Sequence, residues 1–268
     1  MIIAAFGSSF NYGFSVGLYN TPYQVIFDFC NEVYNERYGV DITSSEFATI
    51  HSLINGFMLL GGIVGSFFSG FFADVFGRKG GIYVTNSLVI ITSILNGSSE
   101  YLRSHEILIL SRFITGIYCG IFSGILPLYL NELPPRNLRG ITGGLNQLSI
   151  VLGILTSNIL GLPYMLGTST LWPVLVSLTG IPCCTNLIGL LFAVESPKFL
   201  YNSGKKEKTL EVLIKLRGCE KIANEEIEEL EEEFIQTKDR KEIAWMDFLK
   251  IRSLRIPLLI SIFIKVII

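Results

Sequence analysis

Residues 47–80 read FATIHSLINGFMLLGGIVGSFFSGFFADVFGRKG, an apolar stretch that ends in a short charged turn. No Asp, Glu, Lys or Arg occurs from Phe47 to Ala73. A helix needs about 20 apolar residues to cross a hydrocarbon core of about 30 Å, because each residue advances it by about 1.5 Å. The stretch therefore predicts a membrane-spanning helix over residues 47–69, followed by a turn at the membrane surface.

Apolar stretches of this kind recur along the whole chain. Half of its 268 residues are hydrophobic and 16% are charged, whereas soluble domains carry about 25% charged residues. The long uncharged stretches predict six membrane spans. They cover residues 2–22, 47–69, 81–99, 107–130, 141–164 and 172–194. The composition therefore indicates a multi-pass, all-helical membrane protein, with the lipid bilayer as its surroundings.

The C-terminal part of the chain differs from the six spans. It contains a mixed-charge segment and then a further apolar run from Ile256 to Ile268, which is too short to cross a bilayer. The predicted domains are a six-span part over residues 1–194, a cytoplasmic helical loop over 195–254 and the truncated start of a seventh span over 255–268. The glutamate-rich run at 225–233 favours a solvated helix face over a metal or partner site.

Charges in the short loops predict the orientation, because Lys and Arg remain on the cytoplasmic side. The loops after the second, fourth and sixth spans are basic. They hold Arg78 and Lys79, then Arg136 and Arg139, then the bases from Lys198 to Arg255. The opposite loops are mostly acidic, so we expect a cytoplasmic N-terminus. The net charge of −2 gives no indication of nucleic-acid binding.

Several kinds of chemistry are not supported by the residue patterns. Neither His51 nor His105 has a recognisable nucleophile motif around it, and no glycine-rich phosphate loop or paired-cysteine spacing occurs. We therefore expect no enzyme activity, metal or cofactor. Cys30 is the single cysteine in a predicted outer loop, so no disulfide is expected. The sequon Asn96-Gly97-Ser98 ends the third span, where we expect it to remain unmodified.

The first predicted span is rich in small and polar residues. They are Gly7, Ser8, Ser9, Asn11, Gly13, Ser15, Gly17 and Asn20. Such residues are tolerated where a helix lines a water-filled cavity or packs closely on other helices. We favour cavity lining for this span. In the fourth span Gly116, Gly120 and Gly124 recur at every fourth position, which predicts a smooth packing ridge.

Five segments in register carry a resemblance to a known family. They are Gly70-Phe-Phe-Ala-Asp74-Val-Phe-Gly77-Arg78-Lys79-Gly80, Arg112-Phe-Ile-Thr-Gly-Ile-Tyr-Cys-Gly120, Pro127-Leu-Tyr-Leu-Asn-Glu132-Leu-Pro-Pro-Arg136-Asn-Leu-Arg139-Gly140, Gly144-Leu-Asn-Gln147-Leu-Ser-Ile-Val-Leu-Gly153 and Glu195-Ser-Pro197-Lys-Phe-Leu. The first resembles the inner-loop signature of the major facilitator superfamily. Together the five resemble the sugar-porter family, specifically the animal facilitative glucose and fructose transporters.

The resemblance implies a fold of twelve spans in two six-helix halves, each built from two inverted three-helix repeats. The predicted fold class is therefore an all-α membrane protein, a major-facilitator N-terminal six-helix half with a truncated seventh helix. The missing C-terminal half is an implied partner. Because alternating access needs both halves, we expect the chain to be inactive alone.

The resemblance also implies residues that bind a sugar. Gln147 corresponds to a fifth-span glutamine that hydrogen-bonds the sugar, and Ile150 and Val151 correspond to residues that pack its apolar face. Asn11 stands where fructose-preferring relatives have glutamine, which makes it a second candidate. An amide offers both a donor and an acceptor to hydroxyl groups. The alternative for Gln147 is an interhelical hydrogen bond.

A second implied set forms ion pairs at the cytoplasmic edge. The set is Asp74, Arg78, Glu132, Arg139 and Glu195. In the family, residues matching Arg78, Glu132 and Arg139 pair with the second half when the transporter faces outward, which makes a bistable gate. The segment at Glu195 has an equally good explanation as a helix start, with Ser196 as its cap and Pro197 in its first turn.

The function implied is facilitative transport of a hexose, glucose or fructose, by alternating access. We expect a uniporter, because no Asp or Glu lies in the interior of a predicted span. Ser15 stands where proton-coupled sugar porters have an aspartate. Two alternatives remain open: a non-transporting sugar sensor or interaction protein, and a major-facilitator transporter of another small solute.

Overall fold

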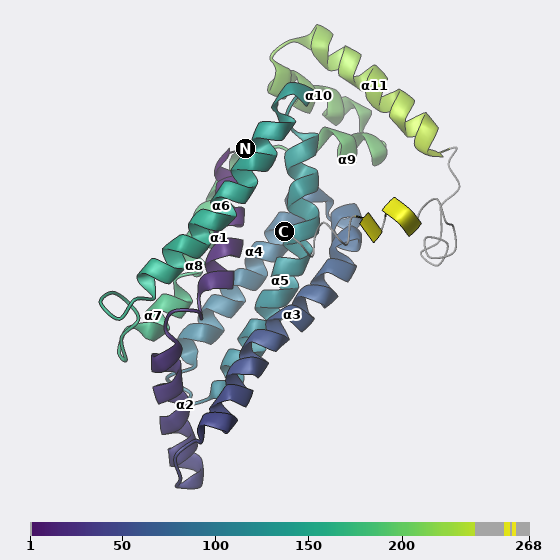
Figure 1. Ribbon diagram of the computed structural model, residues 1–268. Helices are drawn as coiled ribbons and strands as arrows, with labels where there is room; N and C mark the ends of the chain where they lie inside the picture. The colour runs from purple at the N-terminus through teal and green to yellow at the C-terminus, as the bar shows by residue number, and fades with distance from the viewer. Residues whose placement is uncertain (1, 239–254, 258, 261–268) are drawn as a thin grey trace. The chain divides into compact units, whose positions relative to one another are not determined.

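A computed structural model describes residues 2–238, 255–257 and 259–260 of the chain (Figure 1). The described residues fall into two compact units, which divide between residues 216 and 217. The described residues are helical, with turns and loops but no strands. This confirms the all-helical prediction. Residues 239–254 of the predicted cytoplasmic loop lie outside the described residues, and so do residues 258 and 261–268 of the predicted seventh span.

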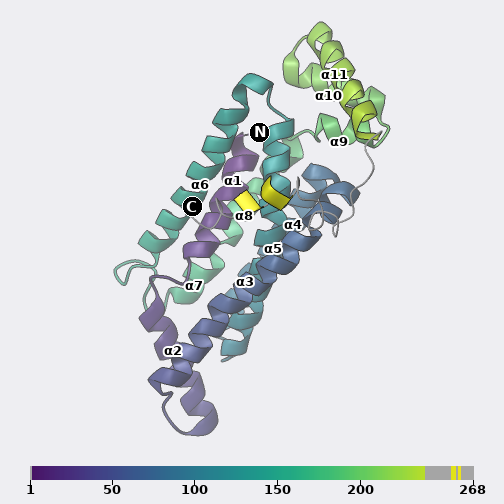
Figure 2. The same cartoon turned by 45° about the vertical axis from the view of Figure 1, so that its right-hand side comes forward.

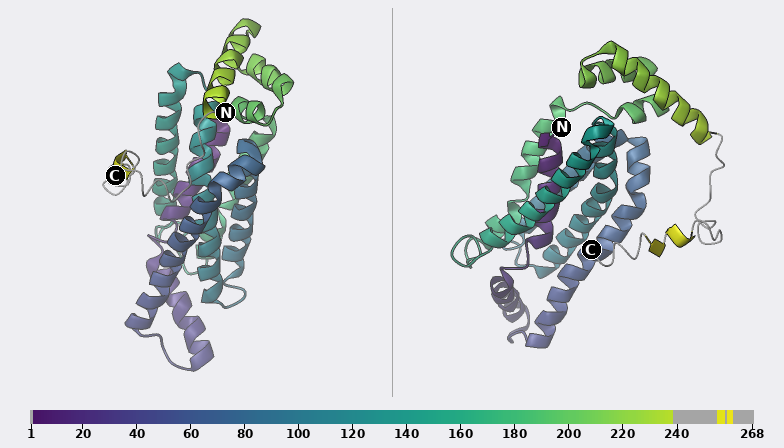
Figure 3. Two further views of the ribbon diagram at one scale, coloured as in Figure 1. Left: turned by 90° about the vertical axis from the view of Figure 1, so that its right-hand side faces the viewer. Right: turned by 45° about the horizontal axis from the view of Figure 1, so that its top comes forward.

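Six helices form the bundle of the first unit. They are α1 (Ile2–Gly17), α3 (Ser44–Val75), α4 (Gly77–Ser98), α5 (His105–Glu132), α6 (Arg139–Leu160) and α8 (Gly180–Phe192). Figures 1 and 3 show them running side by side. Three further helices lie at the ends of the bundle. α2 (Tyr23–Tyr38) and α7 (Trp172–Ser177) lie at one end, and α9 (Pro197–Asn202) lies at the end that holds the N-terminus. We refer to these as the α2 end and the α9 end.

The helix boundaries follow the predicted spans, with one break. The predicted span 172–194 consists of α7 and α8, which meet at Leu178 and Thr179. Pro182 explains the restart, since it has no N–H to donate to Leu178 and is tolerated in the first turn of a helix. Leu178 O instead accepts from Ile181 N at 3.1 Å. This bond joins residues three positions apart, as in the tighter turn of a 3₁₀ helix.

Four stretches within the described residues are long and apolar enough to cross a membrane: Ser44–Val75, His105–Glu132, Arg139–Leu160 and Trp172–Phe192. Neither α1 nor α4 is among them. The described part of α1 is 16 residues long. On α4, polar side chains are buried against other helices at Thr85, Asn86, Thr92 and Asn96. Polar residues are tolerated inside a bilayer where they face the bundle interior.

Glycines bring α3 and α5 into backbone contact, and Figure 2 shows these two helices side by side. A Cβ atom at Gly116 would collide with Met58 O and Gly61 Cα, and one at Gly65 would collide with the backbone of Ile117. Gly120 meets the backbone of α3 in the same way. The every-fourth glycine spacing of the predicted fourth span thus forms a packing ridge, as expected.

The same device joins α1 to α6. A Cβ at Gly13 would collide with Ile150 O, and one at Gly153 would collide with Phe10 O. In each case the first helix of one three-helix repeat packs on the second helix of the other, which relates the repeats α1, α3, α4 and α5, α6, α8 by pseudo-symmetry. The glycines of α1 therefore serve close packing rather than cavity lining.

The lateral surface of α3 is strongly apolar and exposed. Leu59, Ile63, Phe67 and Phe71 recur every fourth residue on it and are 59–76% exposed. A continuous stripe of this size is a liability in water, whereas lipid tails would cover it. The stripe therefore supports a membrane setting for the bundle.

The second unit contains α11 (Glu220–Lys238). Its fold includes a two-pronged ion pair in which Arg217 Nε and Nη2 each lie 2.8 Å from a Glu226 oxygen. The remaining glutamates of the run at 225–233 are exposed, as predicted for a solvated helix face.

Candidate functional site

The predicted sugar-binding residues on α6 lie on an open face of the bundle. Gln147 is exposed, Val151 one turn further is 50% exposed, and Ile150 is half-buried. Gly144, one turn earlier, adds to this face, because a Cβ there would meet nothing within 4 Å. Among the described residues no side chain hydrogen-bonds the Gln147 amide, so the interhelical bond considered as its alternative role is not formed here.

Asn11, the second candidate, lies elsewhere. Its side chain is 2% exposed and points into the bundle, and neither amide atom has a hydrogen-bond partner among the described residues. Its neighbours on the same stripe of α1 are also buried: Ser8 accepts a bond from Asn186, and Ser15 accepts one from Tyr118. The structure thus does not bring Asn11 to the face that carries Gln147.

Burial of these α1 side chains corrects the cavity-lining interpretation. Ser8, Ser9, Asn11 and Ser15 are all at most 4% exposed. The hydroxyl groups of the three serines bond to other helices, as when Ser9 Oγ donates to Asn146 Oδ1 at 2.6 Å. Polar side chains in a bilayer gain more from such partners than from exposure, because unsatisfied groups are costly there.

Arg112 forms a buried polar centre for which the sequence analysis predicted no role. This α5 residue is 2% exposed, its Nη1 donates to Ser15 O at 2.8 Å, and its guanidinium lies 4.2 Å above the Tyr19 ring. Tyr19 in turn donates to Asn96 Oδ1 at 3.1 Å. A signal was available, since an arginine inside an apolar span is a functional-site hypothesis by default.

Asn96, the acceptor residue of the glycosylation sequon, is part of this interior network and is therefore not accessible for modification. Its side chain is 2% exposed, Oδ1 accepts from Tyr19 and Ser111, and Nδ2 donates to Val176 O at 3.5 Å. A glycan cannot be attached to an amide held inside a helix bundle, as expected for a sequon at the end of a span.

The predicted ion-pair residues gather at the α9 end, where the α3–α4 turn meets the end of α5. Arg78 Nε and Nη2 donate to the two oxygens of Glu132 at 2.9 and 3.0 Å, and each of these side chains is 11% exposed. Asp74 lies 3.8 Å from Arg78 and is 81% exposed. Ser196 Oγ donates to Glu132 as well. Two-pronged, mostly buried pairing of this kind is the strong form of a salt bridge.

The other two residues of the set are arranged differently. Arg139, at the start of α6, is exposed. Glu195 Oε1 accepts the backbone N–H groups of Lys79 and Ser196, at 3.0 and 2.9 Å. Ser196 caps α9, with its Oγ accepting from Phe199 N at 3.2 Å and Pro197 in the first turn. The helix-start explanation of this segment is therefore confirmed.

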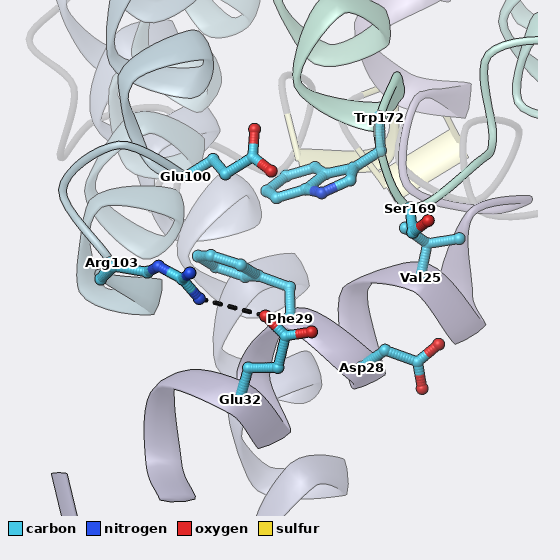
Figure 4. A pocket seen from close by; sticks show the side chains of 8 residues that line it. All are labelled: Val25, Asp28, Phe29, Glu32, Glu100, Arg103, Ser169 and Trp172. Atoms are coloured by element: carbon cyan, nitrogen blue, oxygen red, sulfur yellow. Dashed lines mark hydrogen bonds and ion pairs between the residues drawn. The ribbon is translucent and has the colours of Figure 1, made fainter. Parts of the chain in front are cut away.

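A charged pocket lies at the α2 end (Figure 4). Its lining is Val25, Asp28, Phe29, Glu32, Glu100, Arg103, Ser169 and Trp172. Arg103 donates to Glu32 at 3.1 Å, and the rings of Phe29 and Trp172 lie 4.9 Å apart. Nearby, Arg37 bonds Glu106, and this hydrogen bond raises the pKa of Arg37 above its ordinary value. Among the described residues, no group of three His, Cys, Asp or Glu side chains could hold a metal.

Comparison with known proteins agrees with this geometry. The model of the family described as "Sugar (and other) transporter" matches residues 1–267. The chain is 37% identical over 264 residues to facilitated glucose transporter member 3 of solute carrier family 2 from Ovis aries, covering 98% of this chain and 53% of the relative. It is 37% identical over 258 residues to member 1 from Gallus gallus, covering 96% and 52%. The chain thus spans about half the length of these relatives.

Solved structures show the same fold. The proton:xylose symporter XylE bound to 6-bromo-6-deoxy-D-glucose has a TM-score of 0.74 at 21% identity, covering 85% of this chain and 51% of that one. A partially occluded inward-open structure of XylE from E. coli has a TM-score of 0.73 at 22% identity, covering 88% and 59%. At this identity the likeness concerns the major-facilitator fold alone.

Proposed function

Since the chain belongs to the family of sugar and other transporters, we propose that it forms the N-terminal half of a facilitative hexose carrier that works by alternating access. The relatives that are 37% identical are named as facilitated glucose transporters, which supports glucose or fructose as the substrate class. The proposed setting is the plasma membrane, with the N-terminus and the α9 end in the cytoplasm, because the basic loops gather at that end.

The open face of α6 is the proposed wall of the sugar site, and the unpartnered amide of Gln147 on it is the observation that carries this proposal. An exposed amide among apolar side chains can donate to one sugar hydroxyl and accept from another. Ile150 and Val151 would cover the apolar C–H face of the ring. The second half of the carrier would supply the opposite wall.

The environment of Arg112 supports uniport rather than proton symport. Proton coupling inside a membrane needs a group that gains and loses a proton. Here the guanidinium bonds the carbonyl oxygen of Ser15 and lies over Tyr19, so neutral groups take the place that a carboxylate would have in a proton-coupled site. We propose that this fixed charge orders α1 against α5.

The pair of Arg78 and Glu132, with Asp74, Arg139 and Glu195 around it, is the proposed cytoplasmic gate. Its rigid core lies within this half. Exposed Arg139 is the member free in space to meet charges of the second half when the carrier faces outward. Substrate binding would shift the balance between the paired and unpaired states.

The test joins residues 1–254 to the second half of the sheep relative and expresses the completed carrier in cells without hexose carriers. Gln147→Leu should weaken uptake of labelled hexose by about one to two decades in affinity, because losing the bond and stranding a hydroxyl costs about 1.5–3 kcal/mol. Leu148→Met, a volume-conserving change at the neighbouring exposed position, is the matched control. An unchanged half-saturation constant in Gln147→Leu, at equal surface expression, would remove Gln147 from the site.

A further inference from the structure

The first turn of α4 has no cap of its own. α4 follows α3 after the single residue Phe76, whose side chain cannot accept a hydrogen bond. The first backbone N–H groups of a helix lack intrahelical partners and are normally satisfied by a side-chain oxygen next to them in sequence. Lys79, the third residue of α4, instead donates its backbone N–H to Glu195 Oε1 at 3.0 Å, although Glu195 is 116 positions away.

The turn is shaped to admit this distant carboxylate. Gly77 has a φ of +79°, a conformation that side chains disfavour. A Cβ at Gly77 would also lie 2.6 Å from Glu195 Oε2 and 2.7 Å from Phe199 Cε1. Glycine is therefore required twice, by the backbone angle and by the space that Glu195 occupies.

Further bonds hold the segment that carries Glu195 in place. Tyr129 OH donates to Val194 O at 2.7 Å, and Lys79 Nζ donates to Ala193 O at 2.7 Å. The segment is thus fixed to both α4 and α5. The two glutamates have different partners. Glu132 accepts hydrogen bonds from the Arg78 guanidinium, whereas Glu195 accepts them from backbone N–H groups.

We propose that Glu195 is a positioning residue. From a distant segment of the same chain it caps the first turn of α4, and it thereby holds Arg78, the residue before Lys79, opposite Glu132. In this role the carboxylate works as a hydrogen-bond acceptor, and its charge is secondary. The expectation from family resemblance was an ion-pair partner in the gate, for which charge is essential. Only the transport consequence rests on the proposed function, whereas the cap is a property of this chain.

Hydrogen exchange of residues 1–268 in lipid nanodiscs, resolved at the Lys79 amide by mass spectrometry, tests the cap directly. Glu195→Ala removes the acceptor and should speed exchange by up to about tenfold, the factor for losing one ordinary hydrogen bond. Glu195→Gln retains an oxygen acceptor and should stay within about threefold of the parent. Gly77→Ala, whose methyl group would displace Glu195, should resemble Glu195→Ala. Gly70→Ala, on the α3 side of the turn with nothing within 4 Å, is the control.

The outcomes separate the cap from the transport proposal. Equal acceleration in Glu195→Gln and Glu195→Ala, or none in Glu195→Ala, would overturn the cap. In the completed carrier, Glu195→Gln should retain more of the maximal uptake rate than Glu195→Ala, since Arg78 stays in place. If exchange responds as expected while the completed carrier moves no hexose, the cap stands and the transport proposal fails.

Discussion

The pair of Arg78 and Glu132 should contribute substantially to the stability of the bundle, because both side chains are mostly buried. Each is 11% exposed, and the guanidinium meets the carboxylate twice, at 2.9 and 3.0 Å. An exposed ion pair contributes about 0–1 kcal/mol, whereas removing one partner of a buried pair costs about 3–5 kcal/mol, since the other charge is left unpaired. The remaining exposure places this pair at the lower end, at about 3 kcal/mol.

A double-mutant cycle measures this contribution. Arg78→Gln and Glu132→Gln should each lower the Tm of residues 1–268 in detergent by about 6–12 °C, because 1 kcal/mol shifts Tm by about 2–4 °C for a unit of this size. The double variant leaves neither charge unpaired. Its loss should therefore fall short of the summed single losses by about 2 kcal/mol.

The control is Asp74→Asn, since Asp74 lies 3.8 Å from Arg78 and is 81% exposed. Because the pair is exposed and its charged atoms are far apart for an ion pair, Asp74→Asn should change the free energy of unfolding by less than about 0.5 kcal/mol. Scan rate and salt are held constant across the series. Single losses as small as that of Asp74→Asn, or single losses that simply add in the double variant, would refute the view that burial makes this pair strong.

Three further predictions follow from other parts of the bundle. Gly116→Ala should destabilise by about 1–3 kcal/mol, because its methyl group would meet Met58 O and Gly61 Cα, whereas Gly56→Ala, with open space around it, should be neutral or slightly stabilising in the same thermal assay. The completed carrier should move hexose without alkalinising the medium, and Ser15→Asp should introduce sugar-dependent alkalinisation by placing a carboxylate beside Arg112; alkalinisation by the parent would contradict uniport. Residues 1–268 alone should give no saturable hexose uptake at normal surface expression, since one half supplies one wall of the site; saturable uptake would show that two copies can assemble into a working carrier.

Much of the fold could be predicted from the sequence, because a bilayer requires each segment that crosses it to be apolar and to satisfy its own backbone hydrogen bonds. An uncharged run long enough to cross the bilayer therefore forms a helix, and residues 47–69 are a clear example. The span predicted at residues 172–194 is likewise long and apolar enough to cross a membrane, but it consists of two helices, α7 and α8. At residues 172–194 Pro182 interrupts the helix, which pure hydropathy does not register.

The candidate site could be predicted less completely. Gln147 falls on an open face, but Asn11, the second sugar candidate, is inside the bundle. The sequence does not distinguish a polar residue that lines a cavity from one that is buried between helices, because Ser and Asn are tolerated in both places. Which of the two applies depends on the packing of α1 against α6, which glycines such as Gly13 and Gly153 bring into contact.

The sequence by itself determined the membrane class, the helical spans and the transporter family, because these depend on local hydropathy and on motifs within a few residues of each other. Only the tertiary structure decided what Arg112 bonds to and what Glu195 does. Ser15 and Arg112 are 97 positions apart, and Lys79 and Glu195 are 116 positions apart. Hydrogen bonds act over about 3 Å, so such partnerships exist only once the helices have packed.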